Sequence, residues 1–168
     1  MAVSLNYLSQ ITTDEQIDTN VPGVSAANRH VRHTLFDTSL ALNGSSTPKV
    51  SKCAFFTKAL TAGAATIDLT ALPGTNGGTV DLTGLKVRAI KIRASGSNAN
   101  PLTVKNGASN GYGLDAAESN WTLVLDAGQE ALIYTGTTSV AVGSGAKTID
   151  LAGTGTQSVD VAIFAGGD

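Results

Sequence analysis

The sequence predicts an all-β protein, a jelly-roll-like β-sandwich of about eight strands with an extended N-terminal arm. Three observations lead to this class. From about Val50 onward, short apolar or β-branched segments follow one another at roughly 8–12-residue spacing, separated by glycine-rich turns. The composition combines abundant Ala, Val, Leu, Ile and Thr with 5% aromatic residues and 19 glycines. No window of about 12 residues between 50 and 168 keeps a helical period.

The chain of 168 residues divides into an arm, 1–49, and a single sandwich domain, 50–168. In the arm, lone apolar residues are scattered through the polar stretch "SLNYLSQITTDEQIDTNVPG" and cannot build a core of their own. We therefore expect the arm to order only against a partner. Residues 25–42 fit either a short helix beginning at Ser25 or a strand over 31–42, and the strand is favoured.

Within the sandwich, the segment "LKVRAIKIR" alternates, but its parity slips halfway along. A β-bulge between Ala89 and Ile90 would return its apolar residues to one face and bury Ile90 and Ile92. The cationic residues would then form a basic row on the outer face: Lys86, Arg88, Lys91 and Arg93.

Two further local patterns make structural predictions. The segment "WTLVLDAGQEALIY" predicts a β-hairpin that turns at 126–128, with Trp121 in the core in phase with Leu123 and Leu125. Cys53, in the apolar run "CAFF", is expected to be a buried and unreactive thiol.

Composition and charge disfavour several classes of function. The net charge of −2 and the pI of about 5.6 argue against a nucleic-acid-binding domain. No apolar run is long enough for a membrane span, and no signal peptide is visible at the N-terminus. With a single cysteine, neither a disulfide framework nor a cysteine metal cluster is expected. No cofactor is expected.

One phrase occurs twice, as Thr-Ile-Asp-Leu at 66–69 and again at 148–151, 82 positions apart (148 − 66). Its aspartates could be metal ligands or catalytic residues, or the repeat could be an ordinary feature of two similar β-strands. Each aspartate is flanked by apolar residues, whereas a calcium loop crowds oxygen ligands at short spacing. The sequence therefore favours half-buried strands whose outward aspartates accept backbone N–H groups of nearby turns. These aspartates are Asp68 and Asp150, with Asp81 and Asp160 in the segments that follow.

Two other patterns partly match the motifs of a catalytic site and of a metal site. The pentapeptide "GASNG" at 107–111 matches a nucleophile elbow around Ser109, but no helix follows it and both histidines precede it. His30 and His33, with Asp37, have loose metal-ligand spacing, but Arg29 and Arg32 beside them disfavour a dication. The sequence therefore predicts no catalytic residue, no metal site and no enzyme.

The order of segments as a whole resembles the small virion proteins of tailed bacteriophages, of the capsid cement or decoration kind. The segments are "LTAGAATIDLTALPGTNG", "VDLTGLKVRAIKI", "LTVKNGASNGYGL", "WTLVLDAGQEALIY" and "AKTIDLAGTGTQSVDVAIF", which together cover about 60–165, with "MAVSLNY" and "TNVPG" nearer the start. The resemblance implies a β-rich protein that forms trimers at the symmetry axes between capsomers. It carries no residue-by-residue site.

From this resemblance we expect a structural virion protein that is made in the host cytoplasm and located on the capsid surface. Its expected partners are the major capsid protein and two further copies of itself, with no nucleic acid and no membrane. Candidate partner-contact residues all lie in the arm: Leu5, Tyr7, Ile11, Ile17, Arg29 and Arg32. The alternative is a carbohydrate-binding or tail-associated receptor-binding module that uses Tyr112 and the loop 107–120.

Overall fold

The computed structural model describes residues 2–11, 13–16, 30–33, 38–115 and 120–168. All regular structure in these residues is β-strand, and no helix among them is long and apolar enough to cross a membrane. The strands are β1 (Ser4–Ser9), β2 (Thr13–Gln16), β3 (His30–His33), β4 (Thr38–Asn43), β5 (Lys52–Ala59), β6 (Ala64–Asp68), β7 (Leu72–Pro73), β8 (Thr79–Val80), β9 (Lys86–Ala94), β10 (Leu102–Asn106), β11 (Thr122–Leu125), β12 (Glu130–Tyr134), β13 (Thr148–Ala152) and β14 (Ser158–Gly166).

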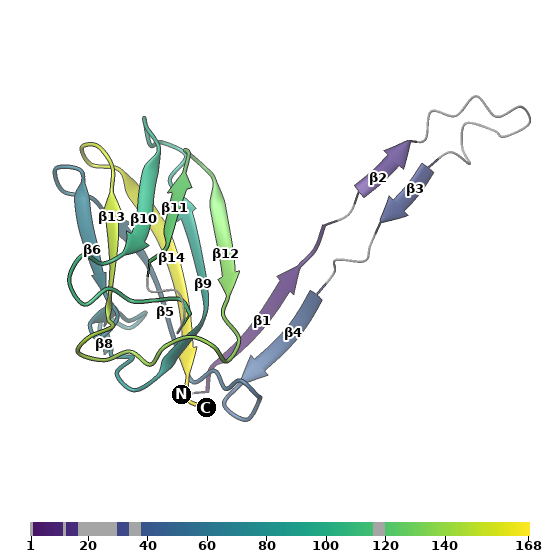
Figure 1. Ribbon diagram of the computed structural model, residues 1–168, viewed down its shortest axis with the longest axis horizontal. Coiled ribbons are helices and arrows are strands. Elements are labelled where there is room, and N and C mark those ends of the chain that lie inside the picture. Colours follow the sequence, from purple (N-terminus) through teal and green to yellow (C-terminus); the bar gives the residue numbers. More distant parts are fainter. Residues whose placement is uncertain (1, 12, 17–29, 34–37, 116–119) are drawn as a thin grey trace, which may run out of the picture.

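Two four-stranded antiparallel sheets form the sandwich, in the orders β11-β10-β13-β6 and β12-β9-β14-β5. Every connection between consecutive sandwich strands, except that from β10 to β11, passes from one sheet to the other. This is the connectivity expected of a jelly-roll-like sandwich, and the predicted all-β class is confirmed. Three short ribbons, β1–β4, β2–β3 and β7–β8, complete the structure (Figure 1).

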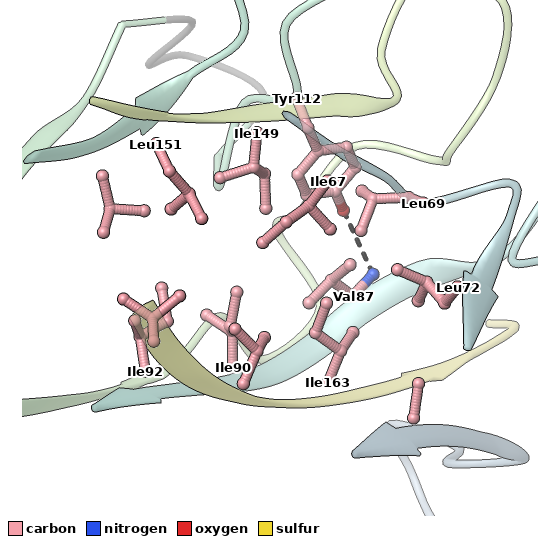
Figure 2. Packing of buried hydrophobic residues seen from close by; sticks show 14 of the residues in the cluster. Ile67, Leu69, Leu72, Val87, Ile90, Ile92, Tyr112, Ile149, Leu151 and Ile163 are labelled. Atoms are coloured by element: carbon pink, nitrogen blue, oxygen red, sulfur yellow. Dashed lines mark hydrogen bonds between the residues drawn. The ribbon is translucent and has the colours of Figure 1, made fainter. Parts of the chain in front are cut away.

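The core lies between the two sheets, where inward side chains of both layers meet (Figure 2). Strand β14 shows how the sequence specifies it. Its residues alternate between buried and half-buried, so Val159, Val161 and Ile163 all point into the core. The facing layer supplies Ile67, Ile149 and other branched residues from β6, β10 and β13. Alternation in the sequence thus becomes one continuous apolar layer.

A β-bulge does interrupt β9, but one position earlier than predicted. Phe164 of β14 lies opposite Ala89, while its neighbour Ala165 lies opposite Val87, so Arg88 is the extra residue. Beyond the bulge, Ile90 and Ile92 are fully buried, as the sequence predicted, and Arg93 is exposed.

Arg88 is therefore not a member of an outer basic row. Its side chain is 0% exposed and its guanidinium donates to the carbonyl oxygens of Gly136 (2.9 Å) and Gly167 (2.6 Å). It also pairs with the carboxylate of Asp168 at 2.9 Å. The bulge places this residue under the end of β14, where backbone acceptors can compensate the burial of its charge.

The predicted hairpin over 121–134 is wrong. Strand β11 pairs with β10, whereas β12 pairs with β9 in the other sheet. The turn at 126–129, closed by a hydrogen bond from the Gln129 N–H to the Asp126 carbonyl (3.0 Å), links the two layers instead of two neighbours in one sheet. Trp121 is half-buried against the core, as its phase with Leu125 suggested, and its Nε1 donates to the Tyr112 carbonyl at 2.8 Å.

Candidate partner-binding surface

The N-terminal residues form a two-stranded ribbon that projects from one end of the sandwich (Figure 1). Strand β1 pairs with β4 in antiparallel register from Ser4 opposite Asn43 to Ser9 opposite Thr38. The β2–β3 ribbon continues in the same direction, away from the two sheets. The preference for strand over helix in residues 31–42 is confirmed for 31–33 and 38–42, and residues 34–37 lie outside the described part.

The root of the ribbon is packed on the sandwich of its own chain. Leu5 and Leu42, opposite each other, form a second apolar cluster with Val50 and Ala89. The Tyr7 ring lies 5.1 Å from the Tyr134 ring on β12, centroid to centroid. We expected the arm to order only against a partner, but in the structure its root packs on the sandwich of its own chain.

The structure covers some of the candidate contact residues and leaves Ile11 exposed. Leu5 is 9% exposed and Tyr7 is half-buried, so their own chain covers much of both. Ile11, just beyond β1, is 63% exposed. Arg32 belongs to β3, and Ile17 and Arg29 lie outside the described residues.

Leu8 is an exposed apolar residue that sequence reasoning did not single out. Its side chain is 61% exposed. Successive strand residues point to opposite faces, so Leu8 points away from the ribbon face on which Leu5 and Tyr7 pack. Any molecule that covers Leu8 must therefore approach from the far side of the ribbon.

A groove lies on the outer face of the sheet β12-β9-β14-β5. It measures about 390 Å³ and is lined by Phe55, Ala162, Lys91 and neighbouring residues. Ala162 lies opposite Phe55 on one side and Lys91 on the other, and Lys91 lies opposite Leu132. The small Ala162 therefore forms a floor between two bulkier side chains, Phe55 and Lys91.

Exposed apolar residues lie in and beside this groove. Phe55, in its lining, is 53% exposed and meets Phe164 edge to face, with ring centroids 5.3 Å apart. Leu132, which lies opposite the lining residue Lys91, is 43% exposed. Cys53 is half-buried on the same face, since Ala54 takes the inward position. The predicted burial of the Cys53 thiol is therefore wrong. The segment "CAFFTK" indicates this exposed face, because side chains alternate along a strand and only one of Phe55 and Phe56 can point inward.

The charges beside the groove are paired within the chain. Lys91 pairs with Glu130 at 3.0 Å, and Arg93 pairs with Asp160 at 2.7 Å. Arg93 above all, and then the Thr57 hydroxyl, hold the pKa of Asp160 below its ordinary value. The groove therefore combines apolar side chains such as Phe55 with charges that are already paired within the chain, so no unpaired charge stands among its described lining residues.

The aspartates of the repeated phrase have structural partners, as the sequence predicted. Asp68 accepts hydrogen bonds from the Thr70 N–H (2.9 Å) and hydroxyl (2.6 Å), and Lys147 lies 3.1 Å away. These contacts, led by the Thr70 hydroxyl, lower the pKa of Asp68. Asp81 accepts the same pair of bonds from Thr83. Asp150 accepts from the Ala108 N–H at 2.8 Å.

The segment 107–111 is a tight loop against β13. The Tyr112 N–H and the Gly107 N–H both donate to the Thr148 carbonyl, at 2.8 and 2.9 Å. A Cβ on Gly111 would lie 2.2 Å from the Gly107 carbonyl oxygen, so close backbone packing explains this glycine. Ser109 is exposed in this loop and belongs to no strand–turn–helix elbow.

Tyr112 cannot serve as the sugar-stacking residue of the alternative hypothesis. Its side chain is 0% exposed, and its hydroxyl donates to the Val140 carbonyl (2.7 Å) and accepts from the Val87 N–H (3.1 Å), as Figure 2 shows for Val87. Burial raises the pKa of the Tyr112 phenol. Its ring is a bridge between the layers, so that alternative loses its main contact.

Among the described residues, no group of three or more His, Cys, Asp or Glu side chains could hold a metal ion. The suggested histidine pair lies in β3, in a segment whose side chains are not described, and Asp37 is also outside the description.

No protein-family model matches the chain. No curated protein matches it either. Among solved structures, it is similar to a chain of the "Cyanophage Pam1 capsid asymmetric unit", with 20% sequence identity and a TM-score of 0.36. The alignment covers 68% of this chain and 82% of that chain. A likeness of this size carries no argument about function, which is therefore argued from the surfaces described above.

Proposed function

We propose that this chain is a structural virion protein, a cement or decoration protein that binds the outside of a phage capsid shell and stabilises it. The observation that carries the proposal is the projecting ribbon (Figure 1), with the exposed apolar residue Ile11 just beyond β1. A projecting strand pair adds contacts beyond the area of one globular face. The resemblance of the sequence segments to small phage virion proteins points to the same role.

In this proposal the sandwich is a rigid body and the arm, residues 1–49, makes the contacts. The major capsid protein is the partner, and three copies of the chain act together so that weak contacts are multiplied by avidity. The outer part of the arm carries the remaining candidate contact residues, which are Ile11, Ile17, Arg29 and Arg32.

The register of β1 and β4 allows the outer arm to be removed without its root. Ser9 and Thr38 are the last paired residues, so a two-residue Asn-Gly turn in place of 10–37 would join them as a short hairpin. This variant keeps Leu5 and Tyr7 on the sandwich. It should melt close to the temperature of the full chain.

The test is co-sedimentation with capsids assembled without this protein, followed by electron cryomicroscopy of the particles. The full chain should decorate the outer surface, and the shortened variant should bind at least roughly tenfold more weakly because an avid contact is lost. Val124→Ser, an exposed position on the other sheet, is the control and should bind like the full chain. Absence of binding by the full chain would overturn the proposal. Equal binding by the shortened variant would overturn the role of the arm.

A further inference from the structure

We infer that the groove on the outer face of β12-β9-β14-β5 receives the β1–β4 ribbon of a second copy of this chain. This inference deepens the proposed function by naming the self-association surface, and it rests on that function only for the number of copies. Among the described residues, two exposed apolar features can cover each other: Leu8 on the ribbon, 61% exposed, and Phe55 in the groove with Leu132 beside it, 53% and 43% exposed.

The two features do not meet within one chain. The ribbon packs its Leu5 and Tyr7 face on its own sandwich and then leads away from the sheets (Figure 1). Leu8 points to the opposite side of the ribbon, toward solvent. A groove on one copy and the free side of a ribbon on another can therefore cover each other, whereas the groove and ribbon of one copy cannot.

The shape of the groove suits the free side of a ribbon. Phe55 on β5 and Lys91 on β9 stand on either side of the small Ala162 on β14. Strands lie about 4.8 Å apart, so these two residues are separated by roughly 10 Å at the backbone. The side of a ribbon that carries Leu8 can therefore place this side chain over Ala162, between Phe55 and Lys91.

Charge favours the same occupant. The described strands of the ribbon root, "SLNYLS" and "TSLALN", contain no charged residue. The charges beside the groove are already paired, Lys91 with Glu130 and Arg93 with Asp160. A neutral ribbon can bind in such a groove without leaving a buried charge unpaired. A strongly charged peptide or nucleic acid would find no free charge of opposite sign there.

The contact is also continuous with one already present in the structure. The root of the ribbon covers the row of the sheet that contains Ala89, Phe164 and Tyr134. The next row along the strands is the one that contains Phe55, Ala162 and Leu132. A second ribbon would thus extend an apolar surface that the first ribbon begins to cover. Because ribbon and groove are different patches, the contact is head-to-tail, and three copies can close it into a ring.

The experiment measures the mass of the full chain by light scattering at micromolar concentration. The wild-type protein should be a trimer. Leu8→Asp and Phe55→Asp should each be monomeric, with the dissociation constant raised at least roughly tenfold, because each places a charge in an apolar contact. Val124→Asp is the matched control, 59% exposed on the other sheet, and should remain trimeric. Circular dichroism and melting temperature establish that all the variants fold.

A mixing experiment tests the head-to-tail geometry. In an equimolar mixture, Phe55→Asp still has an intact ribbon and Leu8→Asp still has an intact groove, so one contact can form and heterodimers should appear. A second readout uses Cys53, which lies one row from Phe55 on the same face. Treated with a thiol oxidant such as diamide, which accepts the two electrons and two protons of the thiols, Leu8→Cys should form an interchain disulfide with Cys53, and Leu8→Cys combined with Cys53→Ser should not form this bond.

Several results would overturn the inference. They are a monomeric wild type, trimers of Leu8→Asp and Phe55→Asp that match those of Val124→Asp, or a mixture that stays monomeric. These outcomes are separable from those of the proposed function. A protein that decorates capsids as a monomer contradicts only the inference, whereas a trimer formed through the groove that binds no capsid contradicts only the proposed function.

Discussion

Ile67 and Ile149 lie directly opposite each other on the paired strands β6 and β13. Because the strands are antiparallel, the two copies of the Thr-Ile-Asp phrase run past each other, with Thr66 opposite Asp150 and Asp68 opposite Thr148. The Thr66 hydroxyl donates to the Asp150 carboxylate at 2.7 Å. The phrase is repeated because its two copies are the two halves of one strand pair, and its isoleucines face the core together.

The first prediction concerns this pair. Ile149→Ala should lower the free energy of unfolding by about 2–5 kcal/mol, because the site is fully buried and the removed atoms leave a cavity. Chemical denaturation measures the change. Val124→Ala, at a position 59% exposed, should stay within about 0.5 kcal/mol of the wild type. Similar losses for both variants would contradict the placement of β13 in the core.

The second prediction concerns pH. The lowered pKa of Asp68 means that its contacts with Thr70 and Lys147 stabilise the fold fully above the ordinary value of 3.8. The contribution is lost as the pH falls below 3.8 through the lowered value. Asp68→Asn should be less stable than the wild type at pH 7 by no more than about 1 kcal/mol, since the ion pair is partly exposed. Its stability should then fall less steeply than that of the wild type in denaturation curves between pH 4 and pH 2, whereas parallel curves would contradict the assignment.

The third prediction concerns the loop at 107–111. Gly111→Ala should destabilise the protein strongly, because its Cβ would lie 2.2 Å from the Gly107 carbonyl oxygen. Gly96→Ala is the matched control, with no atom within 4 Å of its new Cβ.

Ser109→Ala should leave the melting temperature and any hydrolytic activity of the preparation unchanged. Loss of an esterase activity in Ser109→Ala would contradict the structural explanation of this loop.

The fourth prediction concerns the buried hydroxyl of Tyr112. Tyr112→Phe leaves the Val87 N–H and the Val140 carbonyl without this partner. The cost should be about 1–3 kcal/mol of unfolding free energy, typical of a buried polar group that loses its hydrogen bond. Thermal and chemical denaturation measure it. Tyr134→Phe, on the outer face, is the control and should change stability by less than about 0.5 kcal/mol.

Much of the fold could be predicted because alternation in a strand such as β14 specifies directly which side chains face the core. Which strands become neighbours could not be predicted in the same way. The segments of β11 and β12 have the pattern of a hairpin whether their turn stays in one sheet or crosses to the other. The exact position of the bulge at Arg88 also depends on backbone acceptors that lie far away in the sequence, such as the Gly167 carbonyl.

The candidate surface was predictable only in part. Ile11 in the arm stands out because its neighbours Gln10 and Thr12 are polar, whereas Leu8 follows Tyr7 and was not singled out. Phe55 and Leu132 do not stand out, because in the sequence an apolar residue on the outer face of a sheet cannot be distinguished from one that faces the core. Their exposure follows from the register of the whole sheet, which sets the row they share with Ala162 and Lys91.

The central position of β14 has a consequence for synthesis on the ribosome. This strand follows β5 and β9 in the chain, yet it lies between them and pairs with both. Their sheet therefore cannot close until β14 itself has emerged from the exit tunnel. Until then the exposed edges are open to pairing with other nascent chains. Slowing translation upstream of β14 should accordingly increase aggregation rather than assist folding.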